Sequence, residues 1–180
     1  DLSNLTLLRN ATWSISNLCR GKPAPRWELV ADLLQPLVTL IHHTDDEVLV
    51  DACWALSYLA DGRGEHVAQL LDASGLGARL VALLAHRNAQ VQTPALRAVG
   101  NVVTGDDAQT QRMLDLAVLS RLRALLDHAR KSIRKEACWA LLNVTAGPVE
   151  QIQAVLDEAG VVGRLVELLG AGEPDVRKES

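Results

Sequence analysis

Short segments built around a tryptophan recur along this chain at a nearly constant spacing. Trp13, Trp54 and Trp139 each have an alanine two residues before them and a polar side chain four residues after them. A fourth segment of the same kind has Arg97 in place of the tryptophan. The successive steps are 41, 43 and 42 residues. A spacing this regular predicts stacked units of similar structure, because a single compact core has no reason to repeat.

The length of the period indicates which kind of repeat this is. Periods of about 40–47 residues are typical of armadillo and HEAT helical repeats. In one unit, apolar spacing predicts helices over residues 65–73, 76–85 and 89–104, with a break at Gly75. Three helices with a glycine break favour armadillo over the two-helix HEAT unit. We therefore expect an all-α, right-handed superhelical solenoid with three helices in each repeat of about 42 residues.

Glycines mark the end of each predicted repeat, where an αL residue commonly closes a helix. They are Gly21, Gly62, Gly105 and Gly147. Residues 175–180 match residues 132–137 in register, so we expect the array to be cut inside a repeat at both ends. The predicted divisions are a third helix over 1–21, full repeats over 22–62, 63–105 and 106–147, and a partial repeat over 148–180.

Charge and cysteine usage narrow the possible partners. The net charge of −4, without a basic stripe, argues against direct binding to nucleic acid and is compatible with a cationic partner. Cys19, Cys53 and Cys138 form no CxxC pair, so we expect buried core thiols in a reducing compartment. No signal peptide and no apolar run of about 18–20 residues is visible. We expect no membrane association, and a location in the cytosol or the nucleus.

The recurring segments place polar and aromatic side chains on one stripe of each third helix. Neighbouring indoles make slots for the stems of lysine or arginine, and an asparagine amide pairs with the backbone of an extended peptide. The alternative is that the tryptophans belong to the core; their repetition with asparagine favours a groove, and only Trp27 is assigned to packing. The stripe consists of Asn10, Trp13, Asn17, Asp51, Trp54, Tyr58, Arg97, Asn101, Glu136, Trp139 and Asn143.

At these residues the chain resembles importin-alpha (karyopherin-alpha), the adaptor family for nuclear localisation signals. The most specific stretches are residues 13–20, 46–62, 93–105 and 133–139. The resemblance implies nuclear import of cargo proteins whose Lys/Arg-rich signals bind as extended peptides in an acidic groove lined by Trp and Asn. It also implies a second partner, importin-beta, which would bind an N-terminal segment that would lie before residue 1.

The resemblance assigns the stripe to two peptide sites and a linker between them. Trp13, Asn17, Asp51, Trp54 and Tyr58 would belong to the major site, and Trp139 and Asn143 to the minor site. Tyr58, Arg97 and Asn101 would line the linker. The minor site's lysine pocket would comprise Val103, Thr104, Asp107 and Thr110, with Asp107 as its acidic member. Leu142 departs from the serine or threonine that the family usually has there.

Two other classes of function compete with this interpretation. A catenin-like armadillo scaffold would bind acidic peptides in a basic groove, which the acidic balance and the Trp/Asn pattern count against. An enzyme would need a catalytic motif, and no HExxH, nucleophile elbow or phosphate loop is present. We expect no catalytic residues, no cofactor and no metal. Four histidines fall in the turn before a third helix and are expected to be solvated: His42, His43, His86 and His128.

Overall fold

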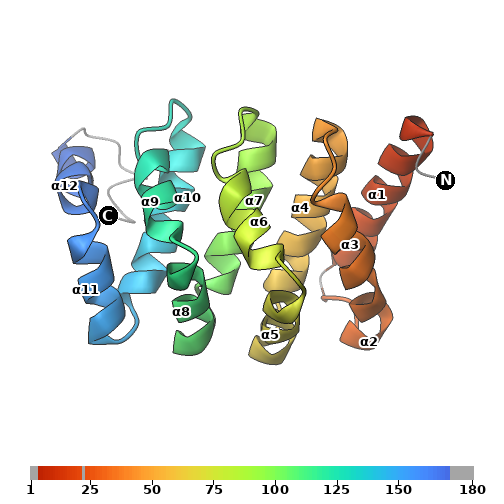
Figure 1. Cartoon of the computed structure of the whole chain (residues 1–180), viewed down its shortest axis with the longest axis horizontal. Helices are drawn as coiled ribbons and strands as arrows, with labels where there is room; N and C mark the ends of the chain where they lie inside the picture. The colour runs from red at the N-terminus through yellow and green to blue at the C-terminus, as the bar shows by residue number, and fades with distance from the viewer. Residues whose placement is uncertain (1–3, 22, 171–180) are drawn as a thin grey trace. The chain divides into compact units, whose positions relative to one another are not determined.

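The computed structural model describes residues 4–21 and 23–170, and within these ranges every regular element is a helix (Figure 1). Long helices alternate with pairs of shorter ones. The elements are α1 (Leu5–Cys19), α2 (Trp27–Val30), the 3-10 helix η1 (Ala31–Leu33), α3 (Leu34–Leu40), α4 (Asp46–Ala60), α5 (Gly64–Asp72), α6 (Leu76–Leu83), α7 (Ala89–Val102), α8 (Asp107–Asp115), α9 (Val118–Leu125), α10 (Lys131–Thr145), α11 (Val149–Asp157) and α12 (Val161–Gly170).

The chain divides into two compact units, and the division falls inside α7 between Ala98 and Val99. In the first unit, α1 packs beside α4, and α4 also contacts α3 and α5. In the second unit, α10 packs against α9 and α11. None of the helices in the described part of the chain is long and apolar enough to cross a membrane.

Polar side chains define where several helices begin. The Asp45 carboxylate accepts a hydrogen bond from the Val48 backbone N–H at 3.2 Å, and α4 starts at the next residue. Asp106 does the same for α8, accepting from the Gln109 N–H at 2.8 Å. Such caps satisfy N–H groups that have no partner within the helix. These aspartates therefore fix the start of each helix relative to the loop before it.

Three of the turn histidines have a structural role that the sequence did not predict. The Nδ1 atoms of His43, His86 and His128 accept backbone N–H groups two residues later, at 2.9, 3.1 and 2.9 Å. All three side chains are half-buried, so the expectation of solvated turn residues is wrong for them. His42 is exposed, as expected. Each hydrogen bond shapes the turn that leads into α4, α7 or α10.

The break before the second short helix has a left-handed backbone in three places. Gly75 has φ 72°, Gly160 has φ 80°, and Ala117 has φ 57°. Glycine adopts this conformation without strain, whereas alanine brings its Cβ close to the following carbonyl oxygen. Ala117 therefore takes a glycine-type position in the second unit at a cost in stability.

Arginines on the second short helices connect successive turns. Arg79 on α6 donates from Nε to the carbonyl of Ile41 at 2.9 Å. In the second unit, Arg164 on α12 donates to the carbonyl of Leu126 at 3.3 Å. Both carbonyls lie where a helix ends and lacks an internal donor. These contacts span 38 residues each and link one repeat to the next.

The cysteines are packed inside, as the sequence predicts. Cys19, Cys53 and Cys138 are free thiols and all are buried. Burial raises the pKa of Cys53 to about 12 and that of Cys19 to about 11, because the thiolate is poorly solvated there. Thiols with such pKa values stay protonated near neutral pH and behave as small apolar side chains.

Candidate functional site

The tryptophans of the first unit lie at its surface. Trp13 on α1 is 60% exposed, so the alternative that it belongs to the core is wrong. Trp54 on α4 is half-buried and stacks on Tyr58 one turn later, with ring centroids 5.9 Å apart and planes inclined by 21°. Among the other stripe residues of this unit, Asn10 and Asn17 are exposed, and Arg97 is half-buried.

Asp51 is a carboxylate in an unfavourable place. It is half-buried one turn before Trp54, and it makes no hydrogen bond or ion pair with the residues that the structure describes. Burial raises its pKa, and the nearby negative charge of Glu47 raises it further. A cation brought to this side chain would oppose both effects, because its positive charge favours the ionised carboxylate.

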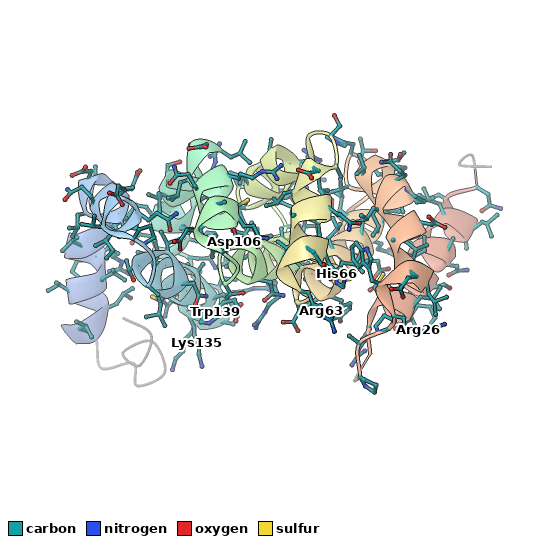
Figure 2. The ribbon with its side chains drawn as sticks, turned by 90° about the horizontal axis from the view of Figure 1, so that it is seen from below. Arg26, Arg63, His66, Asp106, Lys135 and Trp139 are labelled. Atoms are coloured by element: carbon teal, nitrogen blue, oxygen red, sulfur yellow. The ribbon has the colours of Figure 1, made fainter. Side chains whose placement is uncertain are left out.

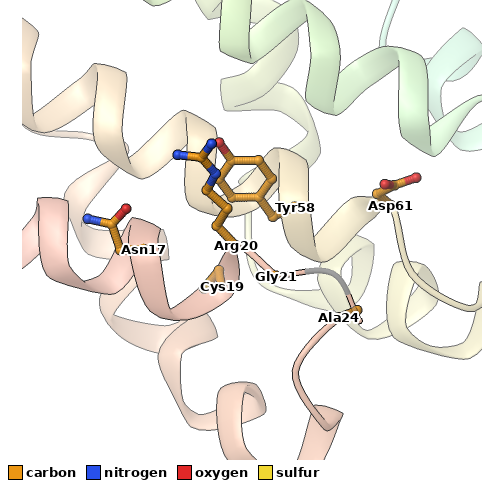
Figure 3. A pocket seen from close by; sticks show the side chains of 7 residues that line it. All are labelled: Asn17, Cys19, Arg20, Gly21, Ala24, Tyr58 and Asp61. Carbon is orange, nitrogen blue, oxygen red and sulfur yellow. The ribbon is translucent and has the colours of Figure 1, made fainter.

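A cavity of about 640 Å³ lies at the end of α1 beside the end of α4 (Figure 3). Two stripe residues, Asn17 and Tyr58, form part of its wall. Arg20 and Asp61 also line it, and neither was predicted as a site residue. The signal that identifies them is register: Arg20 and Asp61 each come directly before a glycine that closes a third helix, as Thr104 does in the predicted pocket.

The second unit contains the corresponding cavity, of about 130 Å³. It brings together the residues that the sequence assigned to a lysine pocket, and it adds one side chain from α10 and another from α11. Its volume equals that of roughly four water molecules in the liquid. The lining residues are Val103, Thr104, Gly105, Asp107, Thr110, Asn143, Ala146, Gly147 and Gln151.

Hydrogen bonds from two directions hold this cavity in shape. Thr110 donates its hydroxyl to the carbonyl of Val103 at 3.4 Å, which ties α8 to the loop before it. Gln151 on α11 donates its amide to the carbonyl of Asp107 at 2.8 Å, across 44 residues of sequence. Gln151 is only 3% exposed, so its side chain forms part of the inner wall of the cavity. Asp107 itself is exposed at the rim.

Gln151 was missed by the sequence reasoning, although a repeat signal marks it. Gln109 and Gln151 lie 42 residues apart, and each follows four residues after a glycine that closes a third helix. A Cβ at Gly147 would overlap the Gln151 amide oxygen. The glycine is therefore needed to let the glutamine lie across the end of α10.

The stripe of α10 lies beside this cavity. Trp139 and Glu136 are half-buried, and Figure 2 shows Trp139 near Lys135, one turn earlier on the helix. The Asn143 amide nitrogen is buried without a hydrogen-bond acceptor among the described residues. Leu142 is 46% exposed between Trp139 and Asn143, where it offers an apolar surface and no polar group. Asn101 on α7 is buried, at 9% exposure.

The sequence profile of the Armadillo/beta-catenin-like repeat matches residues 22–61 and 106–146. These ranges cover α2 to α4 and α8 to α10. These repeats are armadillo repeats. The all-α armadillo fold predicted from the 42-residue period is thus confirmed. Each matched range contains three α-helices, and the first also contains the short 3-10 helix η1.

Several importin alpha subunits match part of this chain. Importin subunit alpha-1b of Oryza sativa subsp. japonica is 56% identical over 113 residues, which are 63% of this chain and 21% of that protein. Importin subunit alpha-B of Dictyostelium discoideum is 53% identical over 102 residues, which are 57% of this chain and 20% of that protein. The resemblance to importin-alpha is confirmed, and this chain spans about a fifth of the length of these relatives.

Solved armadillo structures match over nearly the whole chain. A designed armadillo repeat protein in complex with the peptide (KR)4 has a TM-score of 0.89 and 32% identity to this chain. The match covers 97% of this chain and 72% of the designed chain. A structure of computationally designed armadillo repeat proteins for modular peptide recognition gives a TM-score of 0.90 at 30% identity. The match covers 99% of this chain and 75% of the designed chain.

Proposed function

We propose that this chain is part of a nuclear-import adaptor that binds Lys/Arg-rich localisation signals as extended peptides along the third helices. The observation that carries the proposal is the small cavity of the second unit, which gathers Thr104, Asp107, Thr110 and Asn143. Matches to importin alpha subunits support it, as does a similar armadillo protein solved with a (KR)4 peptide. Under this proposal the protein is a binding protein of the cytoplasm and nucleus, and its further partner is importin-beta.

A lysine side chain suits this cavity chemically. Its ammonium needs several acceptors, and the Asp107 carboxylate supplies the opposite charge at the rim. The Thr110 oxygen supplies a neutral acceptor on the wall. The Asn143 amide nitrogen, which lacks an acceptor, would donate to a backbone carbonyl of the peptide. Trp139, on the same face of α10, would cover the methylene stem of a neighbouring basic residue.

The first unit would bind another part of a basic segment by the same chemistry. Trp13 and Trp54 offer indole surfaces, and Asn17 offers an exposed amide. Asp51 would gain a cation that compensates its charge. Its raised pKa supports this role, because a carboxylate without a partner gains most from a cationic ligand.

One observation favours a different ligand charge. Arg20 lines the larger cavity with Tyr58, and a guanidinium there would suit an acidic side chain. An armadillo scaffold that binds acidic peptides is therefore the second candidate function. Asp61 in the same cavity wall opposes it.

A titration with two labelled peptides separates the candidates. One peptide is rich in lysine and the other is matched in length and charge magnitude but rich in glutamate. We expect fluorescence anisotropy to show tighter binding of the basic peptide, with affinity that falls as salt is raised. Asp107→Asn should weaken this binding several-fold, whereas Asp115→Asn, an exposed carboxylate at the other end of α8, should not. Tighter binding of the acidic peptide would overturn the proposal.

A further inference from the structure

Gly100 occupies a helical position where the backbone does not require glycine. It is buried in the last turn of α7, and positive φ values among the described glycines occur at Gly75 and Gly160 only. Glycine in a helix is less stable than alanine because its backbone loses more freedom on folding. The equivalent positions of α1 and α4 carry serine, at Ser16 and Ser57. Repeat register therefore does not explain this glycine.

The indole of Trp139 explains it. A Cβ at Gly100 would overlap the indole Cζ3 and would lie 2.9 Å from Cε3 and 3.4 Å from Cη2. These atoms form the outer edge of the six-membered ring, so this edge rests directly on the backbone of α7. Both residues belong to the second unit. Any side chain at Gly100 would push the ring away from α7.

We propose that Gly100 is a positioning residue for peptide binding and that it acts through Trp139. The missing Cβ lets the indole lie against α7, so that the ring forms a fixed wall beside Asn143 and the small cavity. The inference rests on the proposed function. It adds that the place of this one ring, and not its presence alone, sets affinity for a basic side chain next to the cavity.

Gly100→Ala tests the inference, with Gly163→Ala as the matched control. Gly163 lies in α12 of the same unit, and a Cβ there has no heavy atom within 4 Å. Labelling with 5-fluorotryptophan allows each indole to be followed by fluorine NMR, and Trp139→Phe assigns the Trp139 signal. We expect Gly100→Ala to move this signal and to weaken lysine-peptide binding about three- to tenfold, in the range of a lost cation–π slot. Gly163→Ala should do neither.

A double-mutant cycle decides whether Gly100 acts through the ring. In a Trp139→Ala background, Gly100→Ala should change peptide affinity less than about twofold, because no ring remains to be displaced. An undiminished loss in that background would overturn the inference, as would a shifted Trp139 signal with unchanged affinity. If Trp139→Ala alone leaves affinity unchanged, the peptide site on α10 fails as well. If Trp139→Ala weakens binding but Gly100→Ala has its full effect in that background, only the role of Gly100 is disproved.

Discussion

Two single residues in this protein lower its stability at places where we propose that a peptide binds. Asp51 is half-buried without a hydrogen-bond or ion-pair partner among the residues described, although an exposed or neutral side chain would suit that position better. Gly100 weakens its helix to make room for a ring. Residues that break local rules tend to occur at functional sites. Each of the two contacts or adjoins a stripe tryptophan of its own unit, since Asp51 lies one turn before Trp54 and Gly100 lies against the ring of Trp139.

Asp51→Asn should therefore stabilise the protein and weaken binding. The raised pKa means that the folded state disfavours the ionised carboxylate, so above that pKa the charge costs stability, which the amide avoids. We expect a higher midpoint in thermal unfolding at pH 7 and about two- to fivefold weaker binding of a lysine-rich peptide. Asp32→Asn, which removes an exposed charge in the same unit, is the control and should leave affinity unchanged. A variant that is both less stable and unchanged in binding would contradict the prediction.

The helical elements follow the repeat pattern, and the differences from it have physical causes. Apolar spacing and closing glycines predicted helices over 65–73, 76–85 and 89–104, and the structure has Gly64–Asp72, Leu76–Leu83 and Ala89–Val102. The histidine acceptors and Gln151 were not foreseen. Their hydrogen bonds depend on side-chain rotamers or on contacts across 44 residues, which the apolar spacing within one helix does not indicate, although both kinds of residue recur at the repeat period. The candidate lysine pocket came from resemblance to a family, not from composition.

Ala117→Gly should relieve strain in the second unit. Ala117 has φ 57°, where an L side chain costs roughly 1–2 kcal/mol. We expect the free energy of unfolding to rise by about 1 kcal/mol, measured from the urea midpoint at constant slope. Gly75→Ala is the reverse experiment in the first unit, and it isolates the backbone because no heavy atom lies within 4 Å of the added Cβ. It should lower stability by a similar amount.

The turn histidines can be tested by their ability to accept a hydrogen bond. His128→Ala removes the acceptor for the Arg130 N–H before α10 and should cost about 0.5–1.5 kcal/mol of stability. His128→Asn retains a side-chain oxygen and should recover part of this loss. His42→Ala, at an exposed position, should be neutral. Equal losses for alanine and asparagine at position 128 would show that packing of the ring, and not its Nδ1 atom, holds the turn.

At the scale of the molecule, acidic groups outnumber basic ones, yet some of them are already paired inside the fold. Asp45 accepts two hydrogen bonds from Arg9, at 3.0 and 2.6 Å, which join α1 to α4. Asp127 is bound by Arg123 and lies 2.7 Å from the Nε of Arg164. The Arg9–Asp45 pair joins α1 to the start of α4, and the Arg164–Asp127 pair joins α12 to the turn after α9, whereas no arginine among the described residues pairs with Asp51 or Asp107. The carboxylates thus divide into those that hold repeats together and those available to a cationic ligand.

This division predicts how stability responds to acid. The hydrogen bond from Arg9 lowers the pKa of Asp45, and that from Arg123 lowers the pKa of Asp127. A carboxyl whose folded pKa lies below its unfolded value, about 3.9, stabilises the fold above that value and loses the contribution as pH falls through the folded pKa. We therefore expect the urea midpoint to hold down to about pH 5 and to fall steeply below about pH 4.

Substitution of the paired carboxylates shows whether they are responsible. Asp45→Asn cannot ionise, so this variant should start less stable at pH 7 and should lose less stability between pH 5 and pH 3 than the parent chain. Asp51→Asn has the opposite sign: its raised folded pKa means that the parent loses the cost of this charge on acidification, so the variant's advantage should shrink as pH falls. Parallel pH curves for the parent and Asp45→Asn would exclude the Arg9 pair as a source of the acid response. Binding of a basic peptide should weaken as Asp51 becomes protonated, at a higher pH than unfolding begins, because the pKa of Asp51 is raised whereas those of Asp45 and Asp127 are lowered.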